Sequence, residues 1–379
     1  MESPSPAFAQ PLHVGRPNIG DRAKFLAGVE AALDRRWLTN DGPLVREFEA
    51  RIADYLGVRH CVAIANGTIA LEIAIRALGL SGEVIVPAFT FVATPHSLHW
   101  QGITPVFADI DPETHCLDPA SVRRAITPRT TGIIGVHLWG RTAPVAELEE
   151  IARESGLQLM FDAAHAFGAS IGDVMVGSSG RAEVLSFHAT KFFNSLEGGA
   201  IVTDDDDVAR QARLMRNFGF AGDDTVISDG TNGKMNEICA AMGLANLDAI
   251  DDVVATNRAN YDAYRDALAG IPGISVLPVG ETGRSNFQYV VMLVNAECPV
   301  ARDEVLADLR SNNVLARRYF WPGCHRMEPY RTLFPDAGAQ LPQTERIADQ
   351  VVVLPTGTAV DRSDIAVIAD IVRATVAAG

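Results

Sequence analysis

Two hydrophobic periods alternate along the first part of the chain. Short apolar runs, typical of buried strands, are separated by segments whose apolar residues recur every three or four positions, as in helices that face a core. The runs predict strands at residues 61–65, 83–87, 105–108, 131–136, 157–161, 184–187 and 200–203. The periodic segments predict helices at 21–37, 43–57, 68–78, 91–101, 119–126 and 145–154. Strands that alternate with helices form a mostly parallel sheet covered on both faces, so we expect an α/β fold.

The pattern changes near Asn236. Residues 236–268 form one Ala-rich helical segment that is long enough to connect two domains. The rest of the chain predicts strands at 275–278, 289–294 and 351–354, and helices at 301–311 and 361–376. A chain of 379 residues also exceeds the size of one simple core. We therefore predict a large domain at 1–250, which includes the N-terminal helices, and a small α+β domain at 251–379.

Composition excludes several classes of protein. The net charge of −15 leaves no basic field for nucleic acid. No run approaches about 18 apolar residues, so we expect no membrane span, and without a basic, apolar leader we expect a cytoplasmic protein. The five cysteines are scattered without a C-x-x-C pair, which argues against disulfides and zinc. His96 and His99 have helical spacing but lack a third ligand, so we expect no metal.

Lys191 is the candidate nucleophile. It follows a predicted strand and lies among aromatic residues, with the hydroxyl groups of Ser186 and Thr190 nearby in the sequence. A lysine in apolar surroundings loses solvation of its ammonium, so its pKa falls and the free amine can attack an aldehyde to form a Schiff base. A lone lysine at a strand end more often extends into solvent. The hypothesis therefore depends on the other loops.

Three further loops carry suitable side chains at predicted strand ends. Gly67 and Thr68 open a helix, where an anion can bind, although a simple helix cap is the alternative. Phe91 could stack on a heteroaromatic ring or belong to the core. Asp162 ends a buried strand and needs a cationic partner such as a pyridinium nitrogen, and His165 could contact an oxygen substituent of the same ring. A helix cap with a neighbouring histidine is the alternative for this pair.

Together the four loops offer a phosphate site, an aromatic ring for stacking, an acid and an amine, which are the groups needed to bind pyridoxal 5′-phosphate (PLP). The sequence resembles the DegT/DnrJ/EryC1 family of PLP-dependent sugar aminotransferases. The resemblance is carried by residues 66–71, 86–94, 162–166 and 186–191, and it extends over almost the whole chain. It implies the PLP-dependent transferase fold of type I, which is aspartate aminotransferase-like, with a large domain around a mostly parallel sheet and a small C-terminal α+β domain.

The resemblance also implies roles for particular residues. Lys191 would carry the cofactor's aldehyde carbon as an imine, while Asp162 pairs with the pyridine nitrogen and His165 lies by the 3-oxygen. Phe91 would stack on the ring. The phosphate would be held by small or hydroxyl-bearing residues, namely Gly67, Thr68 and Ser186.

In this family a neighbouring subunit completes each active site, so the resemblance implies a homodimer with shared active sites. Residues 230–235 match the loop that crosses to the partner, and Asn232 or Lys234 would reach the partner's cofactor phosphate. The family usually has an aromatic residue where Gly233 stands and often arginine where Lys234 stands, so the choice stays open. A surface turn is the alternative.

A finer resemblance points to the substrate. Residues 37–40, 137–140 and 316–325 resemble the branch that acts on nucleotide-linked 4-keto-6-deoxyhexoses, the 4-aminotransferases of the desosamine and viosamine type. Arg317 and Arg318 could clamp a diphosphate, and we also expect Tyr319 and His325 at the substrate. A basic pair at a domain junction is the alternative.

The expected reaction moves an amino group from L-glutamate to a dTDP- or GDP-linked keto-deoxysugar. The favoured acceptor is dTDP-4-keto-6-deoxyglucose, which would give the 4-amino sugar. The alternatives are an aminotransferase for 3-keto nucleotide sugars or keto-cyclitols, and a non-catalytic sensor with the same fold. Sugar dehydratases of the family carry histidine in place of Lys191, so the lysine favours amino transfer.

Overall fold

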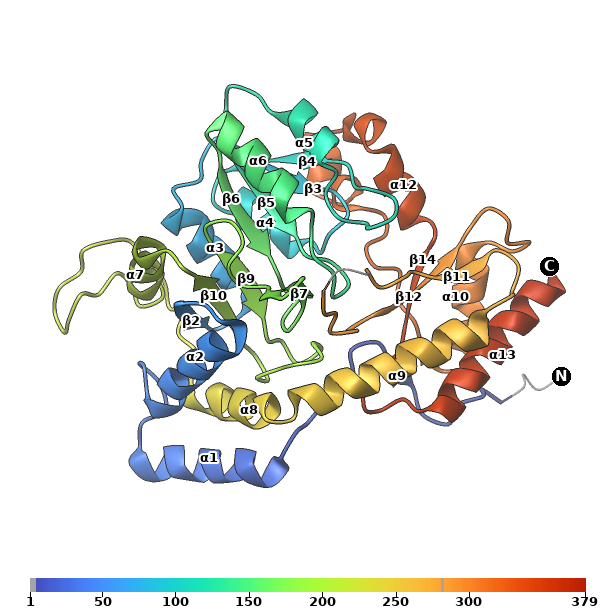
Figure 1. The fold of residues 1–379 in the computed structure, drawn as a ribbon, viewed down its shortest axis with the longest axis horizontal. Coiled ribbons are helices and arrows are strands. Elements are labelled where there is room, and N and C mark those ends of the chain that lie inside the picture. Colours follow the sequence, from blue (N-terminus) through green and yellow to red (C-terminus); the bar gives the residue numbers. More distant parts are fainter. Residues whose placement is uncertain (1–4, 281–282) are drawn as a thin grey trace.

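The computed structural model describes residues 5–280 and 283–379, and its centre is a seven-stranded sheet (Figure 1). The strand order is β2-β10-β9-β6-β5-β3-β4. Every neighbouring pair is parallel except the two pairs that include β10, which is antiparallel to both β2 and β9. The mostly parallel sheet is therefore confirmed. Its strands are β2 (His60–Ile64), β3 (Glu83–Pro87), β4 (Thr104–Ala108), β5 (Thr130–Val136), β6 (Gln158–Asp162), β9 (Glu183–Ser186) and β10 (Gly199–Thr203).

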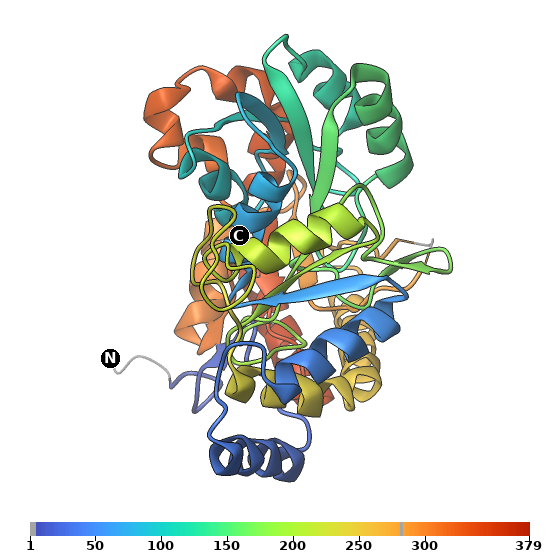
Figure 2. The same cartoon turned by 90° about the vertical axis from the view of Figure 1, so that its left-hand side faces the viewer.

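Helices cover both faces of this sheet because its strands are apolar on both sides. In β2, Cys61 and Ala63 pack with α2 and α8, whereas Val62 and Ile64 pack with α3 and α7. Figure 2 shows α7 and α2 on opposite sides of β2. Farther along the sheet, α5 and α6 continue the first layer and α4 the second. The bounds are α2 (Pro43–Leu56), α3 (Gly67–Ala77), α4 (Ala93–His99), α5 (Pro119–Ala125), α6 (Val145–Ser155), α7 (Asp206–Met215) and α8 (Glu237–Leu247).

The helix predicted at 236–268 is two helices, so that prediction was wrong in one respect. α8 ends at Leu247, and α9 (Ile250–Leu268) begins after a break at Asp248 and Ala249. The carboxylate of Asp248 accepts a hydrogen bond from Arg51 at 2.7 Å and also pairs with Lys24. These ion pairs tie the break to α2 and to α1 (Arg22–Arg35), which lies along the outside of α8 (Figure 1). Because no glycine or proline marks the break, the sequence pattern did not reveal it.

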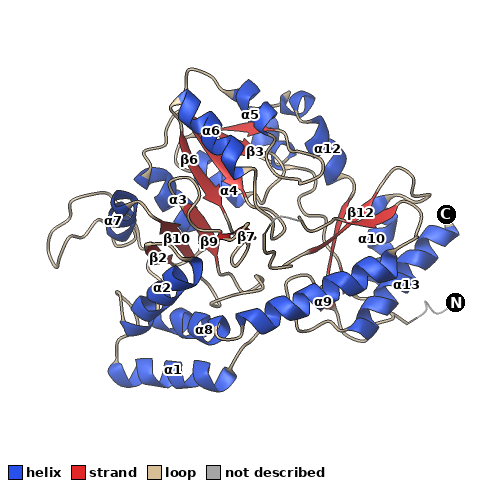
Figure 3. Cartoon of the chain, viewed as in Figure 1, coloured by secondary structure: helices blue, strands red, loops and turns tan. Residues whose placement is uncertain are grey.

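The second sheet has three antiparallel strands and lies at the far end of α9 (Figure 3). Its strands and the helices that pack with them agree with the predicted C-terminal α+β elements within a few residues. They are β11 (Ile274–Val276), β12 (Val290–Val294), β14 (Val351–Leu354), α10 (Arg302–Ser311) and α13 (Arg362–Ala378).

Short elements that the pattern did not predict connect the two halves. β1 (Leu12–His13) pairs in parallel with β13 (Val314–Leu315), so the N-terminal segment joins the C-terminal part. In the other direction, η1 (Cys324–Arg326), α11 (Tyr330–Leu333), η2 (Ala337–Gln340) and α12 (Pro342–Ala348) return to the first sheet. There Asp109 accepts hydrogen bonds from the first turn of α12 at 2.8 and 2.9 Å. A boundary at residue 250 stays a prediction.

The remaining strands form a small hairpin, β7 (Ser170–Ile171) with β8 (Val174–Met175). In the described part of the chain, no helix is both long and apolar enough to span a bilayer. The carboxyl ends of β2, β3, β5, β6 and β9 all open on one edge of the first sheet because these strands run in the same direction. In open α/β sheets ligands bind at this edge.

Candidate active site

A cavity of about 720 Å³ opens at the carboxyl edge of the first sheet. It brings together the predicted residues from four separate loops, namely Gly67, Thr68, Phe91, Asp162, His165, Ser186 and Lys191. The C-terminal part of the chain contributes Arg317 and Tyr319 to the same wall. The loops predicted from strand ends therefore do converge on one site.

Gly67 and Ser186 lie next to each other in the cavity wall. The side chain of Asn66 accepts a hydrogen bond from the N–H of Ile69 at 2.9 Å, so it caps α3, and the first residues of this helix line the cavity. The first N–H groups of a helix have no partner within the helix and attract anions. A Cβ at Gly67 would lie 3.0 Å from the Cβ of Ser186, so this position must stay small to keep the space open.

Asp162 ends β6 and is 5% exposed. Its Oδ2 accepts a hydrogen bond from Thr94 Oγ1 at 2.7 Å, and its Oδ1 accepts one from the N–H of Ala164 at 3.1 Å. Burial raises the pKa of this carboxyl, and the two hydrogen bonds together with the charge of Lys191 oppose that rise. Asp162 is thus a buried carboxylate, held in place, that gains from a cationic ligand atom.

His165 lies in an aromatic wall formed by Trp139, Tyr289 and Phe320, with ring centroids between 4.7 and 5.9 Å from its own. Its Nε2 is 3.4 Å from the hydroxyl of Tyr289, and its buried Nδ1 has no hydrogen-bond partner among the described residues. Burial, together with the charge of Lys191, holds the pKa of His165 well below its ordinary value. The ring is therefore neutral and can exchange a hydrogen bond with a ligand oxygen.

Lys191 follows β9 in a turn closed by a hydrogen bond from its N–H to the carbonyl of His188 at 2.8 Å. Burial of the ammonium lowers the pKa of Lys191 from 10.5 to about 8, and the carboxylate of Asp162 opposes this shift. At a pH near 8, a large fraction of this side chain is a free amine. It therefore has the nucleophilic character that the sequence predicted.

Phe91 remains 55% exposed at the cavity wall, which is unusual for a phenylalanine and leaves its ring available to a ligand. By contrast, its neighbour Thr90 is 1% exposed. Phe91 therefore does not belong to the core.

The guanidinium groups of Arg317 and Arg318 lie in different places. Arg317 lines the cavity, with its guanidinium carbon 4.9 Å from the ring centroid of Tyr319. Arg318 lies outside the cavity lining, where it pairs with Asp303 at 3.1 Å and stacks on Trp321. Successive residues of an extended segment point in opposite directions, so the two guanidinium groups do not form the clamp that we expected. Arg317 alone is placed for it.

His325 also lies outside the cavity lining, although we expected it at the substrate. It is 2% exposed, and its Nε2 is 2.7 Å from Glu345 Oε1. η1 directs the ring into the interface between the C-terminal segment and β4, where it contacts Phe107. This geometry gives no support to a contact between His325 and substrate.

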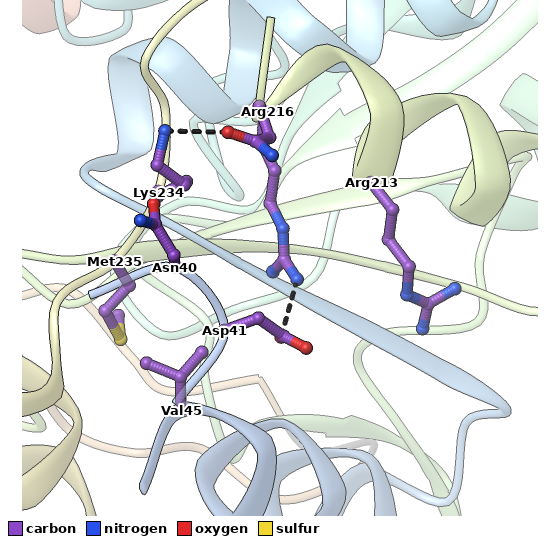
Figure 4. A pocket seen from close by; sticks show the side chains of 8 residues that line it. Asn40, Asp41, Val45, Arg213, Arg216, Lys234 and Met235 are labelled. Carbon is purple, nitrogen blue, oxygen red and sulfur yellow. Dashed lines mark hydrogen bonds and ion pairs between the residues drawn. The ribbon is translucent and has the colours of Figure 1, made fainter. Parts of the chain in front are cut away.

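Lys234 lines a second, smaller cavity of about 260 Å³ (Figure 4). Its Nζ donates a hydrogen bond to Asn217 Oδ1 at 2.9 Å, and Arg216 pairs with Asp41 at 3.1 Å in the same wall. Asn232 is exposed and its backbone pairs with that of Asn217. Neither predicted residue lines the cavity of Lys191, and their contact with a partner subunit stays a prediction.

Sequence reasoning missed four cavity residues or their supports. Thr94 holds Asp162, Tyr289 faces His165, and His188 and Glu197 line the wall near Lys191. Thr94 lies four residues after Thr90, and their hydroxyl oxygens are 3.1 Å apart. No sequence signal linked Thr94 to Asp162 or Tyr289 to His165. Within residues 5–280 and 283–379, no group of three or more His, Cys, Asp or Glu side chains is placed to hold a metal ion.

Comparison with known proteins agrees with this geometry. The model of the DegT/DnrJ/EryC1/StrS aminotransferase family matches residues 20–373. The dTDP-4-amino-4,6-dideoxy-D-glucose transaminase of Escherichia coli is 36% identical over 349 residues, which cover 92% of this chain and 94% of that protein. GDP-perosamine synthase of Caulobacter vibrioides is 36% identical over 359 residues, covering 92% and 96% of the two chains.

Solved structures give the same result. The crystal structure of DesI in the presence of its TDP-sugar product superposes with a TM-score of 0.94 at 51% identity, covering 98% of this chain and 94% of that one. Fold and site thus define a transaminase with the α/β fold of type I, as predicted. The chain belongs to the DegT/DnrJ/EryC1/StrS aminotransferase family.

Proposed function

We propose that this aminotransferase binds PLP in the cavity of Lys191 and transfers an amino group from L-glutamate to a nucleotide-linked keto-deoxysugar. The favoured acceptor is dTDP-4-keto-6-deoxyglucose, aminated at C4. One observation carries the proposal: the Lys191 amine, with a pKa of about 8, shares a cavity with buried Asp162 and with exposed Arg317. Relatives that are named for dTDP-4-amino-4,6-dideoxyglucose and GDP-perosamine support the choice of substrate class.

The residues present fit PLP. The helix end at Gly67 and Thr68, with the hydroxyl of Ser186, suits a phosphate, and the space exists because residue 67 has no Cβ. The buried carboxylate of Asp162 suits a protonated pyridine nitrogen, which would relieve the cost of burying an unpaired charge. His165, which lines the cavity, suits a polar substituent of the cofactor ring. The exposed ring of Phe91 suits stacking on a heteroaromatic face.

When bound, PLP supplies an aldehyde that accepts the amino group and a ring that withdraws electrons from the reacting carbon. Asp162 would keep a proton on the pyridine nitrogen, while Thr94 and the N–H of Ala164 hold its oxygens. Lys191, as a neutral amine, would take a proton through Nζ from the α-carbon of glutamate and deliver it to the carbon that was the aldehyde carbon of the cofactor. In the second half of the reaction it moves a proton the opposite way.

Arg317 is the cationic group that we assign to the nucleotide diphosphate. Its guanidinium stays exposed at the cavity wall and rests on Tyr319. An arginine held over an aromatic ring loses little further freedom when it binds phosphate. This local charge suits an anionic substrate even though the whole chain carries a net charge of −15.

A homodimer with shared sites is also part of the proposal. Asn232 is exposed and Lys234 lies at a surface cavity with two further cationic side chains, those of Arg213 and Arg216. Arg216 is buried and already paired with Asp41 and Glu49, so we assign the contact with a second copy of the chain to Asn232 or Lys234. Sedimentation velocity of the wild type and of Asn232→Ala tests this arrangement, together with the PLP affinity of each protein. We expect Asn232→Ala to remain a dimer and to bind PLP more weakly than the wild type.

The function is tested with purified protein, PLP, L-glutamate and one acceptor at a time. The acceptors are dTDP-4-keto-6-deoxyglucose, its 3-keto isomer, GDP-4-keto-6-deoxymannose and a keto-cyclitol, and mass spectrometry with NMR identifies the product. We expect the dTDP-linked 4-amino sugar as the main product. Amination of the 3-keto isomer or the cyclitol instead would overturn the acceptor assignment.

A second measurement separates an enzyme from a sensor of the same fold. Borohydride reduction in the presence of PLP should attach the cofactor to Lys191 of the wild type, and the Lys191→Ala variant should lose both this labelling and transamination. Labelling of Lys191 without amination of any acceptor would favour the sensor. Absence of labelling would contradict the cofactor assignment.

A further inference from the structure

Glu197 and His188 form a polar pair in the cavity wall near Lys191 that the reaction described above does not use. The Nε2 of His188 is 3.4 Å from Glu197 Oε1. The Nδ1 of the same ring receives the N–H of Thr190 at 3.3 Å and lies 2.8 Å from the hydroxyl of Thr190. Because Nδ1 accepts the backbone N–H, Nε2 carries the ring proton and is the nitrogen that lies nearer to Glu197.

The loop that carries Glu197 is held in a costly conformation. Leu196 has φ +65°, a backbone region that disfavours residues other than glycine by about 1–3 kcal/mol. Its side chain is 38% exposed, so core packing does not explain this geometry. The side chain of Asn194 accepts the N–H of Leu196 at 3.3 Å, and the hydroxyl of Ser195 donates to the carbonyl of Glu197 at 3.1 Å. These local bonds hold residue 197 in a defined position.

The other end of the loop is equally constrained. A Cβ at Gly198 would lie 2.7 Å from the side chain of Met235, and one at Gly199 would lie 2.7 Å from the backbone N of Gly67. The loop is therefore packed between the N-terminus of α3 and the side chain of Met235. A strained backbone that its surroundings maintain beside a cavity indicates that the residue it positions, here Glu197, has a function.

The charge of Glu197 indicates what it recognises. Among the described residues its side chain has one ion-pair partner, His188, and it is 59% exposed at the cavity. A carboxylate repels phosphate and the carboxylates of an amino donor, but it accepts hydrogen bonds from hydroxyl groups at several lone-pair positions. Arg317 supplies the opposite charge on the part of the wall that the C-terminal residues form. The cavity lining thus carries a carboxylate on the segment after β9 and a guanidinium on the C-terminal part of the chain.

We propose that Glu197, oriented by His188, is a specificity residue that binds the hydroxyl group on the carbon next to the reacting carbonyl of the sugar. This inference rests on the proposed function. For a 4-keto-6-deoxyhexose that hydroxyl is the one on C3. A site built to bind a substrate hydroxyl discriminates strongly against the analogue that lacks it, because its polar group is then left unpaired.

The experiment compares wild type, Glu197→Gln and His188→Gln, with Glu30→Gln as the matched control. Glu30 is an exposed residue of α1, so this control removes the same charge away from the cavity. The first quantity is the rate of the absorbance change when L-glutamate alone reacts with the PLP-loaded protein. The second is kcat/KM for dTDP-4-keto-6-deoxyglucose and for its 3-deoxy counterpart. The third is the Kd of the dTDP-linked 4-amino sugar, measured by calorimetry.

Loss of a hydrogen bond to a charged group should lower kcat/KM for the parent acceptor by about tenfold to a hundredfold in Glu197→Gln, with a smaller fall in His188→Gln. Product binding should weaken in parallel. The half-reaction with glutamate should stay within about twofold of wild type, and on the 3-deoxy acceptor Glu197→Gln and wild type should agree within about twofold.

An equal loss on the parent and the 3-deoxy acceptor would overturn the inference, as would a loss confined to the glutamate half-reaction. In both cases amination by the wild type would leave the proposed function intact. If the wild type aminates neither nucleotide sugar, the proposed function itself fails and the inference fails with it.

Discussion

Thr94 Oγ1 donates a hydrogen bond to Asp162 Oδ2 over 2.7 Å; Thr94 is the second residue of α4 and Asp162 is the last residue of β6. Thr94 is fully buried, and its hydroxyl oxygen is in turn 3.1 Å from that of Thr90. A carboxylate that must stay ionised in an apolar site depends on such donors, since burial alone raises its pKa. The hydroxyl of Thr94 therefore supports the charge that the proposed reaction needs.

Thr94→Val should weaken PLP binding. Removing a hydrogen bond to a charged group costs about 1.5–3 kcal/mol, which corresponds to a loss of about tenfold to a hundredfold in affinity if it is fully transmitted to the cofactor. Absorbance titration of the apo-protein with PLP measures it, and Thr94→Ser, which keeps the hydroxyl, is the control. Equal affinities for the valine and serine variants would show that the hydroxyl does not act through Asp162.

Gly67→Ala should also weaken PLP binding, for a steric reason. The added Cβ would lie 3.0 Å from the Cβ and 3.2 Å from the Oγ of Ser186, the hydroxyl that we assign to the phosphate. We expect a loss of affinity of at least about tenfold with a small change in the free energy of unfolding. Gly280→Ala is the control, because its Cβ would have one neighbour, at 3.9 Å. Unchanged affinity would place the phosphate elsewhere.

Lys191 should make the stability of the apo-protein depend on pH. Its pKa is about 8 in the folded state and 10.5 ordinarily, so between these values the unfolded state holds a proton that the folded state has lost. Stability rises with pH wherever the unfolded state binds more protons, so the contribution of Lys191 should become more favourable from about pH 8 to about pH 10.5. Urea unfolding of wild type and Lys191→Met across this range measures the difference. Parallel curves for the two proteins would contradict the lowered pKa.

Asn18→Ala should destabilise the protein and loosen the loop of Lys191. Asn18 Nδ2 donates to the carbonyl of Phe192 at 2.9 Å, and its Oδ1 accepts from the N–H of Thr358 at 3.0 Å. Buried groups left without partners cost about 1–3 kcal/mol each. Urea unfolding should show that loss, whereas Asn295→Ala, which removes an exposed hydrogen bond, should cost about 0.5 kcal/mol or less. A loss no larger than that of the control would mean that Asn18 is not a link between these segments.

Much of the fold, and the site residues that directly follow strands, could be predicted from local pattern. Apolar runs and helical periods located the strands of the first sheet within one or two residues, because burial imposes those periods on neighbouring positions. The residues directly after these strands were also predictable, since parallel strands bring their carboxyl ends to one edge. By contrast, the break at Asp248 and Ala249 carried no local signal.

The sequence by itself determined the alternation of strands and helices, the family motifs and the chemistry of Lys191 and Asp162, because each depends on residue type and near neighbours. Only the tertiary structure decided that Thr94 supports Asp162, that Tyr289 faces His165 and that His325 pairs with Glu345 away from the cavity. These contacts join residues separated by 68, 124 and 20 positions. Which side chains meet over such separations depends on how whole elements pack, and no short-range periodicity encodes that choice.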